Sequence, residues 1–319
     1  MAIRFGGIMN KLLVGLVAFA SSTAFFAGDA FAGELHPTRY LHFNGNKVAV
    51  YESRGHEGPG ILLLHGNTSA ADSYKRILEG PLGSKRHLVA VDLSGYGESD
   101  NAASYSTAFF AQEIAYVAQQ TGVADGIVVG WSLGGDLALQ AAPLLPNAKG
   151  FFLFGTAPVG YTPTLPPAFL SPTESYAGPA VSYGFIAGLT QQQITDYVTA
   201  FFRPNYRNVP QFMIADGLRT DPNTRTAVYL AGTGQDPTTL DEVAVIRNLH
   251  VPVELALGSE DAFVNPAYMD ALAPSIPTLH DGHVRYVQHA GHALHYEDPI
   301  RFTLILEDFI RDAECAAAH

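Results

Sequence analysis

One serine stands where the chain could turn sharply from a strand into a helix. Residues 130–135 read Gly-Trp-Ser-Leu-Gly-Gly, directly after the apolar run 127–129 and before an Ala- and Leu-rich stretch. Glycines beside Ser132 permit a tight turn that holds the serine in a strained, exposed conformation. A glycine-rich turn with an incidental serine is the alternative. The strand-turn-helix setting favours a nucleophile that attacks carbonyl carbon.

A serine nucleophile needs a base, and the base needs an acid that orients it. His292 follows the apolar run 284–287, and Asp261 follows the run 253–257. Both lie at the carboxyl ends of expected strands, where ligands bind in open α/β sheets. The sequence therefore predicts Ser132, Asp261 and His292 as the catalytic residues. Other residues compete for two of these roles: Glu260 as the acid, and His289 and His295 as the base.

The loop after the apolar run 61–64 reads His65-Gly66-Asn67-Thr68. An oxyanion hole needs two backbone N–H groups that point at the developing negative charge. We expect one from Leu133, the residue after the serine, and the other from Asn67. His65-Gly66 could instead only shape a turn. Trp131 and His65 are further predicted to contact the substrate.

The elements that position these residues alternate along the chain. Short apolar runs bounded by Gly, Pro or Asp are typical of strands buried on both faces, and helical patterns lie between them. This alternation predicts an α/β fold with a doubly wound, mostly parallel sheet. A proline-rich stretch, 158–245, interrupts the alternation and is predicted to form a helical lid. We expect 33–157 and 246–319 to form the core.

The N-terminus has the pattern of an export signal. Arg4 and Lys11 precede an apolar stretch, and Ala30-Phe31-Ala32 has the small-x-small form of a cleavage site. The apolar stretch is shorter than the roughly 20 residues of a membrane span. We therefore expect 1–32 to be removed, and the mature chain to be periplasmic or secreted without a stable membrane span.

Composition excludes several classes of protein and partner. The 319 residues are 47% hydrophobic, which argues against disorder, and their net charge of −12 argues against a nucleic-acid partner. The single cysteine, Cys315, rules out an internal disulfide and a thiolate metal cluster. Five histidines near the C-terminus could suggest a metal site: His280, His283, His289, His292 and His295. Because HExxH and His-x-His-x-Asp-His motifs are absent, the sequence predicts no metal and no cofactor.

Residues 40–312 resemble the α/β-hydrolase superfamily, in which the triad follows the chain order serine, acid, histidine. The segments 65–69, 130–135, 154–159, 232–234 and 290–292 are further similar to metal-independent N-acyl-homoserine lactonases. The export signal departs from that family's usual description. The resemblance implies hydrolysis of a small carboxylic ester or lactone. Alternatives are a non-catalytic ligand-binding receptor of this fold and a hydrolase of C–C or amide bonds.

Overall fold

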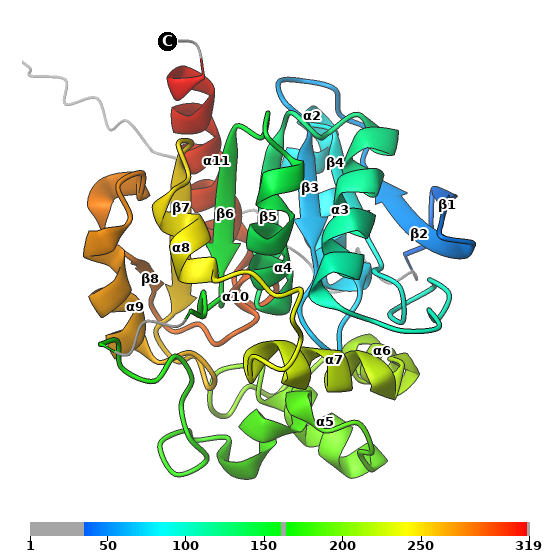
Figure 1. The fold of residues 1–319 in the computed structure, drawn as a ribbon, viewed down its shortest axis with the longest axis vertical. Coiled ribbons are helices and arrows are strands. Elements are labelled where there is room, and N and C mark those ends of the chain that lie inside the picture. The colour runs from blue at the N-terminus through cyan, green and yellow to red at the C-terminus, as the bar shows by residue number, and fades with distance from the viewer. Residues whose placement is uncertain (1–34, 161–163, 318–319) are drawn as a thin grey trace, which may run out of the picture. The chain divides into compact units, whose positions relative to one another are not determined.

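An eight-stranded sheet runs through the computed structural model, which describes residues 35–160 and 164–317 (Figure 1). Its strand order is β1-β2-β4-β3-β5-β6-β7-β8. The pairs β1–β2 and β2–β4 are antiparallel, and the pairs from β4 to β8 are parallel. The strands are β1 (Arg39–Phe43), β2 (Asn46–Glu52), β3 (Ile61–Leu64), β4 (Leu88–Val91), β5 (Ile127–Trp131), β6 (Gly150–Phe154), β7 (Val253–Gly258) and β8 (Arg285–Val287). The predicted doubly wound, mostly parallel sheet is confirmed.

Helices cover both faces of this sheet, because the central strands are apolar on both sides. One face packs against α3 (Thr107–Thr121), α4 (Leu133–Ala141), α8 (Glu242–Arg247) and α9 (Pro266–Leu272). The other face packs against η1 (Ala71–Tyr74), α1 (Lys75–Leu78), α2 (Pro81–Lys85), α10 (Leu294–Glu297) and α11 (Pro299–Ala316). Short 3-10 turns complete the core: η2 (Ala142–Leu144), η4 (Ala273–Ser275) and η5 (His280–Gly282). Strand β5 is buried along its whole length, and it lies between β3 and β6 in the sheet.

Four helices between β6 and β7 lie together at the carboxyl ends of the strands (Figure 1). We call them the cap: η3 (Gly178–Phe185), α5 (Gln191–Thr199), α6 (Gln211–Arg219) and α7 (Pro222–Gly232). Helix α5 begins with a capping box, in which Thr190 and Gln193 exchange side-chain and backbone hydrogen bonds. Helix α8, which follows the cap, packs against α4. The boundary expected at 245 therefore falls inside a helix of the core layer.

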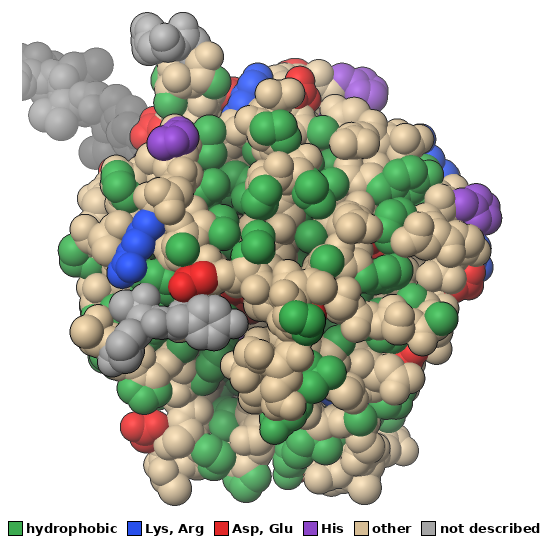
Figure 2. Space-filling model, viewed as in Figure 1, with side chains coloured by type: hydrophobic (Ala, Val, Ile, Leu, Met, Phe, Trp, Pro, Cys, Tyr) green, Lys and Arg blue, Asp and Glu red, His purple; other side chains and the backbone are tan. Residues whose placement is uncertain are grey.

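In the part of the chain that the structure describes, every helix is too short or too polar to cross a bilayer. The expected export signal, 1–32, lies outside the described residues and stays a prediction. Figure 2 shows hydrophobic, acidic and basic side chains interspersed on one face of the molecule.

Candidate active site

Ser132 occupies a strained turn between β5 and α4. Its φ of 52° and ψ of −123° lie outside the regions that residues with a side chain usually adopt. Hydrogen bonds hold this conformation on both sides. The Ser132 N–H donates to the carbonyl of Phe154 at 2.9 Å, and the Ser132 carbonyl accepts from Gly135 N–H at 2.8 Å and from Thr156 Oγ1 at 3.0 Å. The turn leaves the serine side chain partly exposed at the end of the sheet.

The flanking glycines are required because backbone approaches backbone here. A Cβ on Gly134 would lie 2.2 Å from the carbonyl oxygen of Leu64 in β3. A Cβ on Gly130 would lie 2.4 Å from the Cα of Gly135. Both distances are far shorter than atoms can tolerate, so any side chain would push α4 away from the sheet. The spacing that predicted the turn thus has a steric origin.

His292 and Asp261 form a hydrogen-bonded pair at the ends of the two neighbouring strands. His292 Nδ1 lies 2.7 Å from Asp261 Oδ2, and both side chains are buried. The other carboxylate oxygen, Oδ1, accepts hydrogen bonds from the N–H groups of Phe263 (2.7 Å) and Val264 (3.1 Å). With both oxygens engaged, the carboxylate is fixed in orientation. A carboxylate at Nδ1 sets the imidazole tautomer and leaves Nε2 free to act as a base.

The imidazole of His292 is directed toward the end of β6, where Ser132 is anchored. Phe263 packs on the His292 ring at a centroid distance of 4.6 Å. A Cβ on Gly155 would lie 3.1 Å from His292 Cε1, so only glycine leaves room for the ring. Ser132 N–H is bonded to Phe154, the residue directly before Gly155. The structure therefore brings Ser132, Asp261 and His292 to one edge of the sheet.

The alternative acid, Glu260, and the alternative bases, His289 and His295, lie in environments that differ from that of the His292–Asp261 pair. His289 is 86% exposed and is 3.3 Å from Glu260 in a surface pair. His295 is fully buried among aromatic rings, with Trp131 at 4.6 Å and Phe154 at 5.0 Å, and neither ring nitrogen has a hydrogen-bond partner within the described residues. Burial, together with a smaller effect of the neighbouring His292, lowers the pKa of His295 to about 3. Neither histidine has the buried carboxylate partner that His292 has.

The expected oxyanion loop lies against the nucleophile turn. A Cβ on Gly66 would lie 3.4 Å from Ser132 Cβ, so the loop and the serine are in contact. Leu133 is the first residue of α4, and the N–H groups of a first helical turn have no partner within the helix. Asn67 follows β3, and its buried side chain donates from Nδ2 to the carbonyl of Gly184 in the cap at 2.8 Å. Both expected donors thus flank Ser132, and one of them is tied to the cap.

His65 and Trp131, the residues predicted to contact the substrate, both have fully buried side chains. His65 Nε2 accepts from Leu93 N–H at 3.2 Å, so Nδ1 carries the proton and donates to the Gly66 carbonyl at 2.8 Å. Burial lowers the pKa of His65 and keeps it neutral. Trp131 Nε1 donates to the carbonyl of His292 at 3.0 Å. Both side chains therefore hold backbone groups of this edge in place, and substrate contact stays a prediction.

Several residues at this edge were missed by the sequence interpretation. Glu297 accepts hydrogen bonds from Gly291 N–H at 2.9 Å and from Arg203 N–H at 2.8 Å, which joins the loop before His292 to the cap. Asp136 and Glu242 form a buried acid pair next to Leu133, and burial raises the pKa of both. Asp136, Glu242 and Glu297 are too far apart in the sequence to form a recognisable motif. Only Asp136, which closely follows Ser132, could have been noticed.

One group of possible metal ligands lies away from this edge. Donor atoms of His280, Asp281 and Asp308 lie within 4.8 Å of one another. However, Arg285 Nη2 lies 2.8 Å from Asp281 Oδ2 and 3.5 Å from Asp308 Oδ2. The arginine therefore forms ion pairs with both carboxylates.

Comparison with protein families gives one match that covers most of the chain. The model of the family described as the alpha/beta hydrolase fold matches residues 59–299. The range includes the serine turn, the acid and the histidine.

Individual proteins share only low sequence identity with this chain. Polyketide synthase ThaQ of Burkholderia thailandensis is 26% identical over 273 residues, which are 83% of this chain and 12% of ThaQ. The chain therefore spans only a small part of that relative. The pimeloyl-acyl-carrier-protein methyl ester esterase of Stenotrophomonas maltophilia is 25% identical over 243 residues, which are 73% of this chain and 89% of the esterase.

Among solved structures, a serine-to-glycine variant of the N-acyl homoserine lactonase AidH, complexed with N-hexanoyl homoserine lactone, superposes with a TM-score of 0.77. It is 27% identical, and the match covers 86% of this chain and 97% of AidH. By their names, the esterase and the lactonase both hydrolyse ester bonds. The resemblance expected from the motifs is confirmed.

Proposed function

The chain belongs to the α/β hydrolase fold family, and we propose that it is a serine hydrolase of carboxylic esters and lactones. The observation that carries the proposal is the placement of Ser132. A serine held at φ 52° in a strand-to-helix turn shares one sheet edge with the buried His292–Asp261 pair. Strain of this kind persists only where surrounding structure enforces it, and it is typical of catalytic turns.

The geometry supports a two-step acyl transfer. Ser132 Oγ attacks the substrate carbonyl carbon while His292 Nε2 accepts the hydroxyl proton, and the C=O electron pair moves onto oxygen. N–H groups of Leu133 and Asn67 stabilise this oxyanion. The intermediate collapses, the C–O bond breaks, and His292 returns the proton to the leaving alkoxide. Water, deprotonated by His292, then releases the acyl group from Ser132. Asp261 stabilises the imidazolium throughout.

N-acyl homoserine lactones are the substrate class that we favour. A lactone is an internal ester, so the same attack opens it, and its alcohol stays attached to the acyl group. The similarity to AidH, at 27% identity over nearly its full length, supports this class. Phe201, which follows α5, supports it as well, because its ring centroid lies 6.0 Å from that of His292 and makes the surroundings of the base apolar. An apolar wall suits an acyl chain.

The test compares the purified protein with a Ser132→Ala variant. Hydrolysis of p-nitrophenyl butyrate and covalent labelling by a fluorophosphonate should both disappear in Ser132→Ala, because the nucleophile is gone. Ser84→Ala in α2, at the opposite end of the sheet in Figure 1, is the matched control and should retain both signals. Unchanged hydrolysis by a folded Ser132→Ala protein would refute the mechanism.

Lactone opening is measured separately, as acid release from N-hexanoyl homoserine lactone. Release above the Ser132→Ala background supports the lactonase assignment. Ester turnover without lactone opening would identify the protein as an esterase that does not act on these lactones. If neither ester nor lactone reacts and no serine is labelled, the fold serves a ligand-binding role or acts on C–C or amide bonds.

A further inference from the structure

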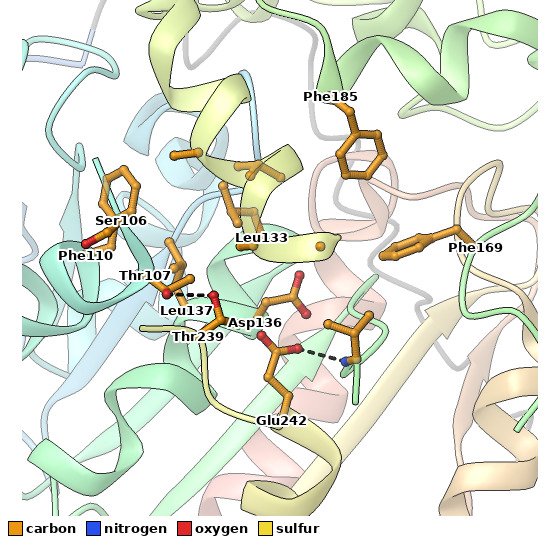
Figure 3. A pocket seen from close by; sticks show the side chains of 15 residues that line it. Ser106, Thr107, Phe110, Leu133, Asp136, Leu137, Phe169, Phe185, Thr239 and Glu242 are labelled. Carbon is orange, nitrogen blue, oxygen red and sulfur yellow. Dashed lines mark hydrogen bonds between the residues drawn. The ribbon is translucent and has the colours of Figure 1, made fainter. Parts of the chain in front are cut away.

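A cavity of about 60 Å³ lies between α3, α4 and the cap helix α7, directly beside Leu133 (Figure 3). Its walls are mainly apolar, and the aromatic side chains come from three different segments of the chain. The apolar residues that matter here are Phe110, Leu133, Val159, Phe169, Phe185 and Ala227. Leu133 also belongs to the proposed oxyanion hole, so the cavity and the proposed reaction site share this residue.

A carboxyl group interrupts this apolar lining. Asp136 lines the cavity, and its Oδ1 is buried without a hydrogen-bond partner in the described part of the chain. A buried polar atom that lacks a partner costs free energy. Such an atom at the wall of a cavity is available to a bound ligand.

Glu242 fixes where the proton of this acid pair resides. Its Oε2 accepts from Val159 N–H at 2.8 Å, and its Oε1 accepts from Gln140 Nε2 at 2.9 Å. Among the described residues, no hydrogen-bond donor contacts Asp136 Oδ1, and burial raises the pKa of Asp136 well above the ordinary range. Because donors favour the carboxylate form, Glu242 is the better site for the charge and Asp136 the better site for the proton. Figure 3 shows the two carboxyl groups side by side.

We infer that Asp136, as a neutral carboxylic acid, donates a hydrogen bond to the amide carbonyl of an N-acylated substrate whose acyl chain enters this cavity. The inference rests on the proposed function and assigns Asp136 as a specificity-determining residue. An acid that stays protonated in an apolar site is an effective hydrogen-bond donor.

The position of Asp136 suits this role. Asp136 N–H bonds to the Ser132 carbonyl at 3.2 Å, which places Asp136 one turn along α4 from the nucleophile. One turn rises about 5.4 Å, and helical side chains lean back toward the N-terminus. In an N-acyl homoserine lactone, only the α-carbon and the amide nitrogen separate the scissile carbonyl from the amide carbonyl. A donor one turn from the nucleophile therefore fits the spacing between the two carbonyl groups.

Two variants and two matched esters test the inference. Asp136→Leu keeps the branched shape of the side chain but removes the donor, whereas Asp136→Asn keeps an N–H donor without charge. The substrates are the p-nitrophenyl ester of N-butanoylglycine, which has the amide at the same spacing, and p-nitrophenyl heptanoate, in which two methylene groups replace the amide. The ratio of their kcat/KM values is compared between the variants and the unmodified protein. Asp136→Ala replaces Asp136→Leu if thermal denaturation shows that the leucine variant does not fold.

We expect Asp136→Leu to lower the ratio of amide ester to plain ester about tenfold, mainly through KM, and Asp136→Asn to keep it within about threefold. Equal losses on both esters, or no loss, would overturn the inference and leave the hydrolase assignment standing. A selective loss on the amide ester without any lactone opening would uphold Asp136 and remove the lactonase proposal. Absence of all ester turnover by the unmodified protein would overturn both.

Discussion

Trp131 Nε1 donates a hydrogen bond to the backbone carbonyl of His292 at 3.0 Å, which joins the residue before the nucleophile to the base. The indole is fully buried, and its ring also contacts those of Phe201 and His295. This single side chain therefore determines the distance between the end of β5 and the loop after β8.

Replacing this indole should reduce catalysis and stability together. Trp131→Phe removes the donor, leaves the His292 carbonyl unpaired and opens a void, so we expect a loss of about 2–3 kcal/mol in the free energy of unfolding. Because His292 loses its anchor, kcat should fall about tenfold or more. Urea denaturation and p-nitrophenyl butyrate kinetics measure the two effects.

The control for this change is Phe152→Leu, a fully buried residue of β6 that packs against Phe302 and Phe309 away from the triad. It should lose stability with little change in kcat. An equal loss of kcat in Phe152→Leu would show that Trp131 acts only through general stability.

Asp261→Asn should lower kcat about 10⁴-fold while KM changes little. An amide at this position favours the wrong imidazole tautomer and cannot stabilise the imidazolium. Glu260→Gln, on the partly exposed neighbouring residue, should change kcat less than about threefold. Steady-state kinetics on one ester decide between them, and the reverse pattern would transfer the acid role to Glu260.

Asn67 connects the oxyanion loop to the cap, so its side chain should control how firmly the cap is seated. Asn67→Ala removes the bond to the Gly184 carbonyl and leaves that buried oxygen unpaired, at a cost of about 1–3 kcal/mol. We expect faster amide hydrogen exchange in η3 and about a tenfold lower kcat/KM. Gln192→Ala, which removes an exposed bond to Asp196 within α5, should change neither quantity. Unaltered exchange in η3 would contradict the link.

His280 should make the stability of the protein depend on pH. It lies between Glu254 at 2.7 Å and Asp312 at 2.8 Å. Burial alone would lower the pKa of His280, but hydrogen bonds to Asp312 and Glu254 outweigh it, and the pKa is raised. A raised folded-state pKa contributes stability that is complete below the ordinary value of about 6.5 and is lost as pH rises through the folded value.

The measurement is urea denaturation of the unmodified protein and His280→Gln at about pH 6 and about pH 9. The variant should be less stable at the lower pH, and the difference should shrink at the higher pH. His283→Gln, on an exposed neighbour, is the control and should show no such trend. A pH-independent difference would mean that His280 contributes through packing alone.

The strands around the site were predictable because each combines a continuous apolar run with a boundary residue. Val253 to Leu257 was expected as a strand, and β7 runs Val253–Gly258. The same apolar runs also predicted which site residues lie at the carboxyl ends of the strands. By contrast, β1 and the helices α2, α6 and α8 were not anticipated. Four of the five residues in β1 are not fully buried, so its sequence carries little hydrophobic pattern.

The hydrogen bonds of His65 and Trp131 could not be predicted from the sequence, because each is made with a backbone group that only the fold brings near. His65 and Trp131 are close to other site residues in the sequence, which suggested contact with the substrate. Each side chain is buried and donates a hydrogen bond to a backbone carbonyl. Asp136 was missed for a similar reason. Its significance depends on Glu242, which is distant in sequence and meets it only after the chain folds.

The cap is tied to the core on two sides of the site, through Asn67 and Gly184 and through Arg203 and Glu297. This double attachment bears on how such an enzyme could be re-engineered. A chimera that exchanged residues 178–232 for the corresponding segment of another hydrolase would alter the backbone to which the oxyanion loop and the histidine loop are bonded. Transferring a new substrate specificity would therefore require that both hydrogen-bonded pairs, Asn67–Gly184 and Arg203–Glu297, are transferred with the segment.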